Sequence, residues 1–186
     1  MASSLIRDPS FETMSATMRW HIGLPSGEIS EWSERLTTDW IIDAGSAVDL
    51  PALRSLMMAA ELPVDKLEPV LPDGLLVARA GDRLGGAGAL QPAGEDGLLR
   101  SLVVDPDWRG RGLGVALLVA LETLARDRAV RNLYLLTETA GAFFPRHGYV
   151  AADRAGVPPP VAATAEFHSV CPGSAVCLTK TLRSVG

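Results

Sequence analysis

The chain has 186 residues, of which 47% are hydrophobic and 21% are charged, and its formal net charge at pH 7 is −5. This length suits one domain of ordinary size with a short appendage, and the apolar content is too high for a disordered protein. The acidic balance argues against a nucleic acid or a membrane surface as the partner.

The cationic side chains are almost all arginine. Only Lys66 and Lys180 are lysines among the 17 cationic residues, and arginine suits the fixed recognition of phosphate or carboxylate. The two cysteines, Cys171 and Cys177, do not make up a four-ligand zinc pattern, so we expect no metal. The sequence shows no secretory signal pattern and no apolar run of about 20 residues, so we expect a cytoplasmic protein that does not span a membrane.

Two parts of the chain differ in pattern. Residues 1–38 hold no long periodic pattern and predict an extension, to which we assign no chemistry. Regular elements begin near Trp40, and we therefore expect a single domain over residues 39–184.

The first half of this domain predicts strands with one or two helices before them. A helix begins where Pro51 follows Asp49 and ends before Pro63, and a second helical piece is expected over residues 64–71. Alternating or continuous apolar runs predict strands, with a hairpin turn at Gly81. These strands cover residues 40–42, 75–80, 84–90 and 98–105.

The second half predicts alternating helices and strands. A helix begins near Leu113, because its apolar residues fall on one stripe. A short helix is expected over residues 140–147, and Gly148 suits the left-handed position that ends it. The remaining strands are expected over residues 132–137, 149–152 and 175–182, and one or two helical turns over residues 161–167.

A glycine-rich basic loop precedes the helix that begins near Leu113. It reads Trp108-Arg109-Gly110-Arg111-Gly112-Leu113-Gly114. The first N–H groups of a helix have no partner within the helix and hold anions, and glycines let the backbone approach a ligand closely. The loop lacks the lysine and the hydroxyl residue of a P-loop, and Val115 breaks the dinucleotide fingerprint at its sixth position.

The spacing Arg109-x-x-Gly112-x-Gly114 resembles the pyrophosphate loop of the GNAT superfamily of acyl-CoA-dependent N-acyltransferases. The runs Leu102–Pro106 before it and Phe143–Tyr149 after it are similar to the same family. The resemblance implies an α/β (α+β) domain in which helices flank a mixed, strongly twisted sheet of about six or seven strands with splayed central strands. It also implies acetyl-CoA as the co-substrate and a homodimer through the last strands as a family-level expectation.

The resemblance assigns roles to the loop and to the strand before it. Pantetheine would lie between the splayed strands, where a backbone N–H would also stabilise the oxyanion of the tetrahedral intermediate. The residues implied in cofactor binding are Leu102, Val103, Val104, Arg109, Gly110, Arg111, Gly112, Leu113, Gly114, Phe144 and Arg146. The milder alternative is a tight turn with two solvated arginines.

The general acid departs from the family pattern. In many GNAT enzymes a tyrosine protonates the leaving sulfur, and Phe144 stands at that position here. CoA would then leave as a thiolate, or take a proton from water or from a hydroxyl such as that of Thr137 or Tyr134. Loss of activity is the remaining alternative.

Arg100 is the polar residue of the central strand that we connect with the acceptor. It lies two residues before Leu102, so both side chains point to the same face. A buried arginine there would hold a carboxylate or another oxyanion of the acceptor, whereas the structural alternative is a pair with Glu95 or Asp96. Glu138 is a candidate base or a cap of the following short helix, and we favour the cap.

The segment before the last strand supplies further candidates for the acceptor site, namely Glu166, His168 and Cys171. The run from Ala163 to Phe167, with Cys171-Pro172 after it, resembles the arsenic-resistance N-acetyltransferases, a small GNAT branch. That resemblance implies a role beside arsenic-detoxification genes and an acceptor such as an arsenical or phosphinic amino acid.

The sequence thus predicts an acetyl-CoA-dependent N-acetyltransferase that acts on a small amine by direct transfer in a ternary complex. Two rival functions stay open. Phe144 favours a non-catalytic acyl-CoA-binding module, and the pair Cys171 and Cys177 favours a thiol-based arsenite binder.

Overall fold

The computed structural model describes residues 40–62, 64, 70, 73–170 and 173–182. The expected extension over residues 1–38 lies outside the described residues, as does most of the helical piece expected over residues 64–71. None of the described helices is long and apolar enough to cross a membrane.

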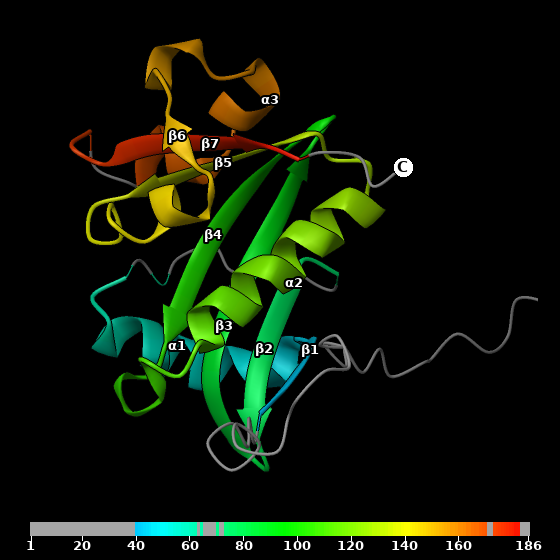
Figure 1. The fold of residues 1–186 in the computed structure, drawn as a ribbon, viewed down its shortest axis with the longest axis vertical. Helices are drawn as coiled ribbons and strands as arrows, with labels where there is room; N and C mark the ends of the chain where they lie inside the picture. The colour runs from blue at the N-terminus through cyan, green and yellow to red at the C-terminus, as the bar shows by residue number, and fades with distance from the viewer. Residues whose placement is uncertain (1–39, 63, 65–69, 71–72, 171–172, 183–186) are drawn as a thin grey trace, which may run out of the picture.

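The described strands form one open mixed sheet in the order β1-β2-β3-β4-β5-β7-β6 (Figure 1). β4 and β5 are parallel, and every other pair of neighbours is antiparallel. The predicted mixed sheet with flanking helices is therefore confirmed. The strands are β1 (Ile41–Ala44), β2 (Leu75–Ala80), β3 (Arg83–Ala93), β4 (Asp96–Val104), β5 (Asn132–Thr137), β6 (Val150–Ala151) and β7 (Val176–Thr181).

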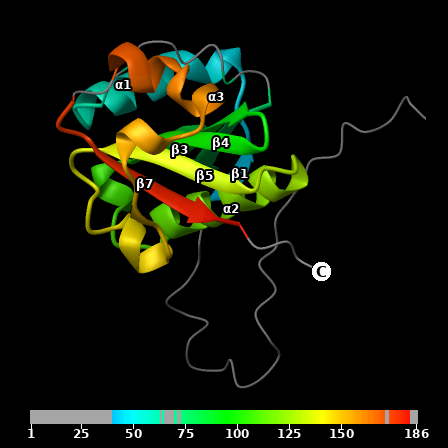
Figure 2. The same cartoon turned by 90° about the horizontal axis from the view of Figure 1, so that it is seen from above.

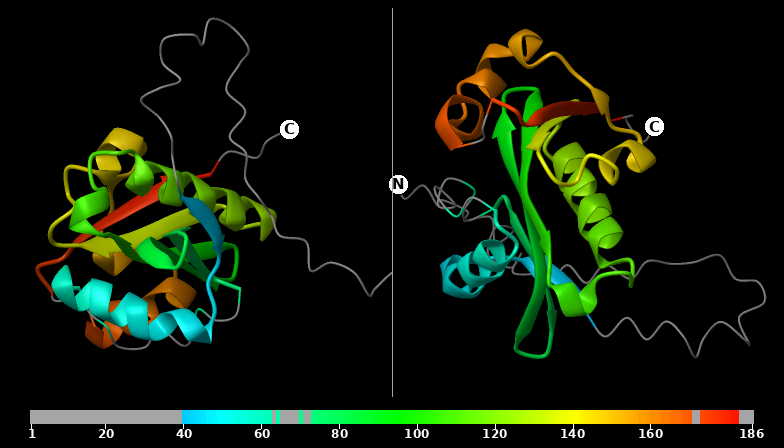
Figure 3. Two further views of the ribbon diagram at one scale, coloured as in Figure 1. Left: turned by 90° about the horizontal axis from the view of Figure 1, so that it is seen from below. Right: turned by 90° about the vertical axis from the view of Figure 1, so that its left-hand side faces the viewer.

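The helices cover both faces of this sheet. α1 (Leu50–Ala59) and α3 (Pro159–Ala162) lie on one face, and α2 (Leu113–Asp127) lies on the other. Figure 2 and Figure 3 show the sheet between these two layers. α1 and α2 each bury the apolar stripe that their sequence predicts, so hydrophobic side chains pack against both faces of the sheet.

α1 packs through residues at helical spacing. Leu50, Leu53 and Met57 are buried against the sheet, in a cluster that also contains Leu75 of β2. Pro51 lies in the first turn, where its missing N–H leaves no helical hydrogen bond unmade. The helix begins and ends close to its predicted bounds.

α2 lies close to β3 because β3 is rich in glycine. A Cβ at Gly88 would lie 2.6 Å from Cδ1 of Leu121, which is fully buried under the helix. A side chain at Gly88 would therefore require the packed Leu121 side chain to shift. The glycines of β3 thus allow α2 to lie close to the strand.

A buried ionic cluster joins α2 to β7. The carboxylate of Glu122 on α2 is buried and accepts a hydrogen bond of 2.6 Å from Nζ of Lys180 on β7. Arg126 lies 3.5 Å from the same carboxylate, one helical turn further on. The ring of Tyr149 lies 5.4 Å from Nζ of Lys180, and burial together with Glu122 raises the pKa of its phenol.

A β-bulge interrupts the pairing of β3 with β4. Ala87 faces Val103 and Ala89 faces Arg100, so two residues of β4 lie opposite Gly88. Ser101 is one of the two, and its φ of +56° is in the left-handed region. The extra residue bends β4 at the middle of the sheet.

The structure corrects the predicted elements of the second half. The helix expected over residues 140–147 is only a short 3₁₀ helix, η4 (Phe144–His147), although Gly148 ends it with a φ of +85° as predicted. Residues 161–167 divide into the end of α3 and a π-helical turn, η6 (Glu166–Val170). α3 begins earlier because consecutive prolines are favoured in a first helical turn.

Candidate active site

A cavity of about 560 Å³ opens where β4 and β5 separate. The two strands pair only from Asp96 with Asn132 to Leu98 with Tyr134, and they diverge beyond that point. The cavity is lined by residues 98–104 of β4, 135–137 of β5, and 108–110 and 112–115 at the start of α2. Met57, Ala60, Leu62, Thr139, Ala140, Phe143, Phe144 and Glu166 complete its wall.

The open edge of β4 presents backbone groups to this cavity. The N–H of Asp105 donates to the carbonyl of Gly85 on β3 at 2.9 Å. Since successive residues of a strand direct their backbone groups to opposite sides, the N–H and C=O of Val104 face away from β3, toward the gap. Nε of Arg109 donates to that carbonyl at 3.1 Å. A ligand in the gap would therefore meet the backbone of Val104.

The glycine-rich loop forms one end of the cavity. Gly110 and Gly112 have φ of +73° and +83°, a conformation that side chains with a Cβ rarely adopt. Helical hydrogen bonding starts with the N–H of Ala116, which donates to the carbonyl of Gly112 at 3.0 Å. The N–H groups of Leu113 and Gly114, before it, have no acceptor within the helix. The loop is thus built to hold an anion.

The predicted loop residues line the cavity with one exception. Arg109 lines it, whereas Arg111 is exposed and lies outside the lining. Gly114 lies under Phe143, since a Cβ there would be 3.8 Å from the phenyl ring. The structure therefore brings the glycines and one of the two arginines together.

The other end of the cavity contains a buried ion pair. Nη2 of Arg100 lies 2.5 Å from Oε1 of Glu166, and their side chains are 3% and 8% exposed. Nη1 of Arg100 also lies 3.4 Å from Oε1 of Gln91 on β3. Glu95 and Asp96, the predicted structural partners of Arg100, bond elsewhere: Glu95 pairs with Arg131, and Asp96 accepts a hydrogen bond from Asn132.

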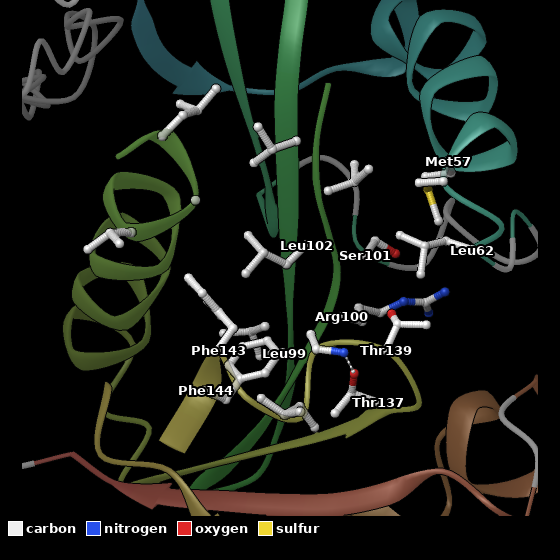
Figure 4. A pocket seen from close by; sticks show the side chains of 18 of the residues that line it. Met57, Leu62, Leu99, Arg100, Ser101, Leu102, Thr137, Thr139, Phe143 and Phe144 are labelled. Carbon is white, nitrogen blue, oxygen red and sulfur yellow. Dashed lines mark hydrogen bonds between the residues drawn. The ribbon is translucent and has the colours of Figure 1, made fainter. Parts of the chain in front are cut away.

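Two of the three predicted catalytic residues line the cavity. These are Arg100 and Thr137, and the hydroxyl of Thr137 accepts a hydrogen bond of 3.0 Å from the N–H of Ala140 (Figure 4). Glu138 is exposed, lies outside the lining, and accepts a hydrogen bond of 2.9 Å from Ser174. Its side chain follows the end of β5 outward, so it neither caps the next helix nor reaches the cavity. The hydrogen bond from Ala140 to Thr137 closes a turn before η4, and η4 itself has no side-chain cap, so the predicted cap is wrong.

Phe144 lies in the wall of the cavity and is buried. Its ring contacts Phe143 and Tyr149 edge-on, with centroids 5.1 and 5.4 Å apart. Arg146 is exposed and lies outside the lining, and the ring of His147 stacks against Phe143 at 4.7 Å. Arg146 therefore lies outside the cavity, and its predicted contact with the cofactor stays a prediction.

The residues before β7 separate in the structure. Glu166 lines the cavity, but His168 is exposed and lies outside the lining. Cys171 lies outside the described residues. Cys177 is buried in β7, where burial raises the pKa of its thiol and disfavours the thiolate that would bind a soft metal. In the described part of the chain no three His, Cys, Asp or Glu side chains gather as a metal site would require.

Several lining residues were not predicted. Met57 and Leu62 form the wall on the α1 side, opposite Phe143 and Phe144 (Figure 4). Ser101 enters the lining through the bulge. The crossing of α1 over the gap leaves no local signal in the sequence, whereas a serine beside a buried arginine in an apolar strand could have been noted.

Comparison with known proteins gives consistent matches. The model of the acetyltransferase (GNAT) domain matches residues 72–151. The amino-acid acetyltransferase of Mycobacterium tuberculosis is 34% identical over 134 residues, 66% of this chain and 72% of that protein. The amino-acid acetyltransferase of Shewanella oneidensis is 32% identical over 139 residues, 73% of this chain. The chain spans only 31% of the length of the Shewanella relative.

Among solved structures, N-acetylglutamate synthase from Neisseria gonorrhoeae, complexed with coenzyme A and N-acetyl-glutamate, has the same fold. Its TM-score is 0.66 at 20% sequence identity. The match covers 77% of this chain and 35% of that chain.

Proposed function

The chain belongs to the GNAT acetyltransferase family, and from this premise we propose that it transfers the acetyl group of acetyl-CoA to the amine of a small amino acid. The observation that carries the proposal is the form of the cavity. One end is an anion-binding glycine loop, and the other end holds a buried arginine between two separated strands. The first suits the pyrophosphate of a coenzyme, and the second suits the carboxylate of an acceptor.

The donor site fits acetyl-CoA. The N–H groups at the start of α2 would hold the pyrophosphate, and Arg109 would add positive charge beside it. The pantetheine chain would lie along the open edge of β4 and pair with the backbone of Val104. Most of the wall there is apolar, so the thioester would lie against hydrophobic side chains.

The acceptor site fits a molecule with a carboxylate beside its amine. Arg100 is the buried cation of the cavity, and its guanidinium can hold a carboxylate through two parallel hydrogen bonds. Phosphinic and arsenical amino acids carry a second oxyanion as well, and they form the narrower acceptor class that the C-terminal resemblance suggests. Both classes share the α-amino carboxylate that Arg100 would recognise.

The leaving thiolate needs no tyrosine in this site. Phe144 carries no proton to give, and the hydroxyls of Ser101, Thr137 and Thr139 line the cavity instead. A CoA thiolate is also a stable leaving group at neutral pH, so proximity and oxyanion stabilisation supply most of the acceleration.

Release of free CoA from acetyl-CoA tests the proposal. The panel contains the protein amino acids, their amides that lack the carboxylate, and phosphinic and arsenical amino acids. We expect acceptor-dependent release with amino acids and none with the matching amides. Binding of acetyl-CoA without release for any amine would instead support the non-catalytic module. Arsenite binding that requires the cysteines would support the thiol-based alternative.

A further inference from the structure

We infer that Glu166 is the general base of the reaction, and that the acceptor's own carboxylate releases it for this role by binding to Arg100. The inference rests on the proposed function, because it names the group that removes the proton from the acceptor amine. It gives the Arg100–Glu166 ion pair a role in proton transfer in addition to acceptor binding.

Glu166 is the carboxylate of the cavity. Among the described lining residues there is no other acid, and no histidine, lysine, tyrosine or cysteine. An amino acid enters as an ammonium at neutral pH, and an ammonium has no electron pair with which to attack the thioester. A proton acceptor is therefore required at the acceptor end, and Glu166 is the described residue that can serve.

The charges of the pair are complementary to an amino acid. Arg100 and Glu166 present a cation and an anion 2.5 Å apart at the end of one cavity. An α-amino acid carries its carboxylate and its ammonium on one carbon atom. When the carboxylate binds Arg100, the ammonium lies within reach of Glu166. An amine without a neighbouring carboxylate would interact with Glu166 but not with Arg100.

The exchange of partners makes the base available. Before the acceptor enters, Arg100 neutralises Glu166 and keeps it ionised in a buried place. The acceptor carboxylate then takes a share of the guanidinium, so Glu166 loses part of its stabilising charge and accepts a proton more readily. Among the described residues, the charged or titratable side chains next to Glu166 along the chain and on η5 (Arg154–Gly156) include Arg154, which donates to the carbonyl of Phe167 at 3.0 Å, and the exposed His168.

Burial favours the proton transfer itself. An ammonium and a carboxylate become a neutral amine and a neutral acid when the proton moves. A cavity that excludes water disfavours both charged forms and so favours this step. The 8% exposure of the Glu166 side chain meets this condition, whereas the exposed Glu138 does not.

The atoms and protons of the step balance. Glu166 takes one proton from the ammonium, and the amine nitrogen attacks the thioester carbonyl carbon to form the C–N bond. The C–S bond then breaks, and the second proton lost from nitrogen ends on the sulfur of CoA. The products are the N-acetyl amino acid and CoA thiol, and Glu166 returns its proton to water when the products leave.

The pH dependence of kcat for Glu166→Gln tests the inference. At saturating acceptor we expect the wild-type rate to stay nearly level from about pH 6 to 8. The variant should lose about 100-fold at pH 7 and recover about tenfold per pH unit as hydroxide takes over the deprotonation. Glu95→Gln is the matched control, since that carboxylate is exposed and far along the sheet, and it should behave as the wild type.

The outcomes are distinguishable. A wild-type enzyme without acceptor-dependent CoA release would overturn the proposed function, and the inference with it. An active wild type with an equally active Glu166→Gln variant would overturn the inference alone. A loss of the same size at every pH would also overturn it, because that pattern indicates a structural role.

The Glu166→Gln variant could fail to fold, because it leaves Arg100 buried without its carboxylate partner. A second pair of variants tests the inference in that case. Arg100→Gln alone should raise the acceptor KM, and its rate should depend less steeply on pH than that of a variant that also lacks the Glu166 carboxylate. Arg100→Gln combined with Glu166→Gln removes both charges and should show the steep profile. Identical profiles for the two variants would contradict the role of Glu166.

Discussion

Nε of Arg109 donates a hydrogen bond of 3.1 Å to the carbonyl oxygen of Val104, and thereby ties the glycine-rich loop to the open end of β4. The two parts of the cavity that would contact the coenzyme, the loop and the strand edge, are thus fixed relative to one another. Arg111, two residues further on, is exposed and outside the cavity.

Arg109→Ala should weaken acetyl-CoA binding by about tenfold, the effect of losing one charge-assisted hydrogen bond and the anchor of the loop. Arg111→Ala should cause a smaller loss. Calorimetric titration with acetyl-CoA measures both, and Arg131→Ala is a control for the change in net charge at an exposed position. Equal affinities for all three variants would refute the assignment of the pyrophosphate to this loop.

Gly88→Ala should lower the free energy of unfolding by about 1–3 kcal/mol, because its Cβ would lie 2.6 Å from Cδ1 of Leu121. Urea denaturation measures the effect. Gly141→Ala is the control, since no atom lies within 4 Å of a Cβ at that glycine. A truncation of Leu121 to alanine in the Gly88→Ala background should cost less than the same truncation in the wild type. Full additivity of the two changes would contradict the close contact.

Lys180→Met should lower the free energy of unfolding by about 3 kcal/mol, because Glu122 stays buried with only the more distant Arg126 as its cation. Arg131→Met offers the comparison. Both members of the Arg131–Glu95 pair are 71% exposed, so that change should cost less than about 1 kcal/mol. Replacing Glu122 by glutamine in the Lys180→Met background should restore part of the stability. Similar decreases in unfolding free energy for Lys180→Met and Arg131→Met would show that burial does not determine how much these two ion pairs stabilise the protein.

The stability of the protein should decrease in acid partly through Asp49. The hydrogen bond from Arg79, 2.7 Å long, holds the pKa of the Asp49 carboxyl below its usual value. A lowered folded-state pKa contributes stability that is present above the unfolded pKa of about 3.9 and is lost as the pH falls through the folded value. The difference in unfolding free energy between wild type and Asp49→Asn should therefore shrink below about pH 4.

Urea denaturation between neutral and acid pH measures this difference, with the exposed Asp82→Asn as control. A gap between wild type and Asp49→Asn that stays constant as the pH falls would show that the ion pair with Arg79 contributes nothing to stability.

The sequence predicted correctly those elements whose position depends on residues close together in the chain. The bounds of β2 and β5 agree with their predicted ranges, because each strand ends at turn residues that the sequence displays. The glycine loop was found for the same reason, since its spacing and its place before a helix are contiguous. The prediction of a short helix over residues 140–147 was wrong, because so short a segment has few residues over which a helix can propagate.

The acceptor end could not be completed from the sequence. Arg100 and Glu166 were each proposed, but their pairing depends on the path of the chain between β4 and η6. The bulge that exposes Ser101 depends on the register of β3 against β4, and the α1 wall depends on how that helix crosses the sheet. Such long-range relationships are properties of packing and have no local spacing to reveal them.

The place of β7 between β5 and β6 sets the order in which the molecule can assemble during synthesis. β1 to β4 pair with neighbours made immediately before or after them, so this half can fold while the ribosome is still adding residues. β5 is different, because it has three residues paired with β4 and finds its longer partner only when β7 emerges. The part of the cavity wall that comes from β5 and Glu166 therefore depends on residues that are synthesised after the glycine loop.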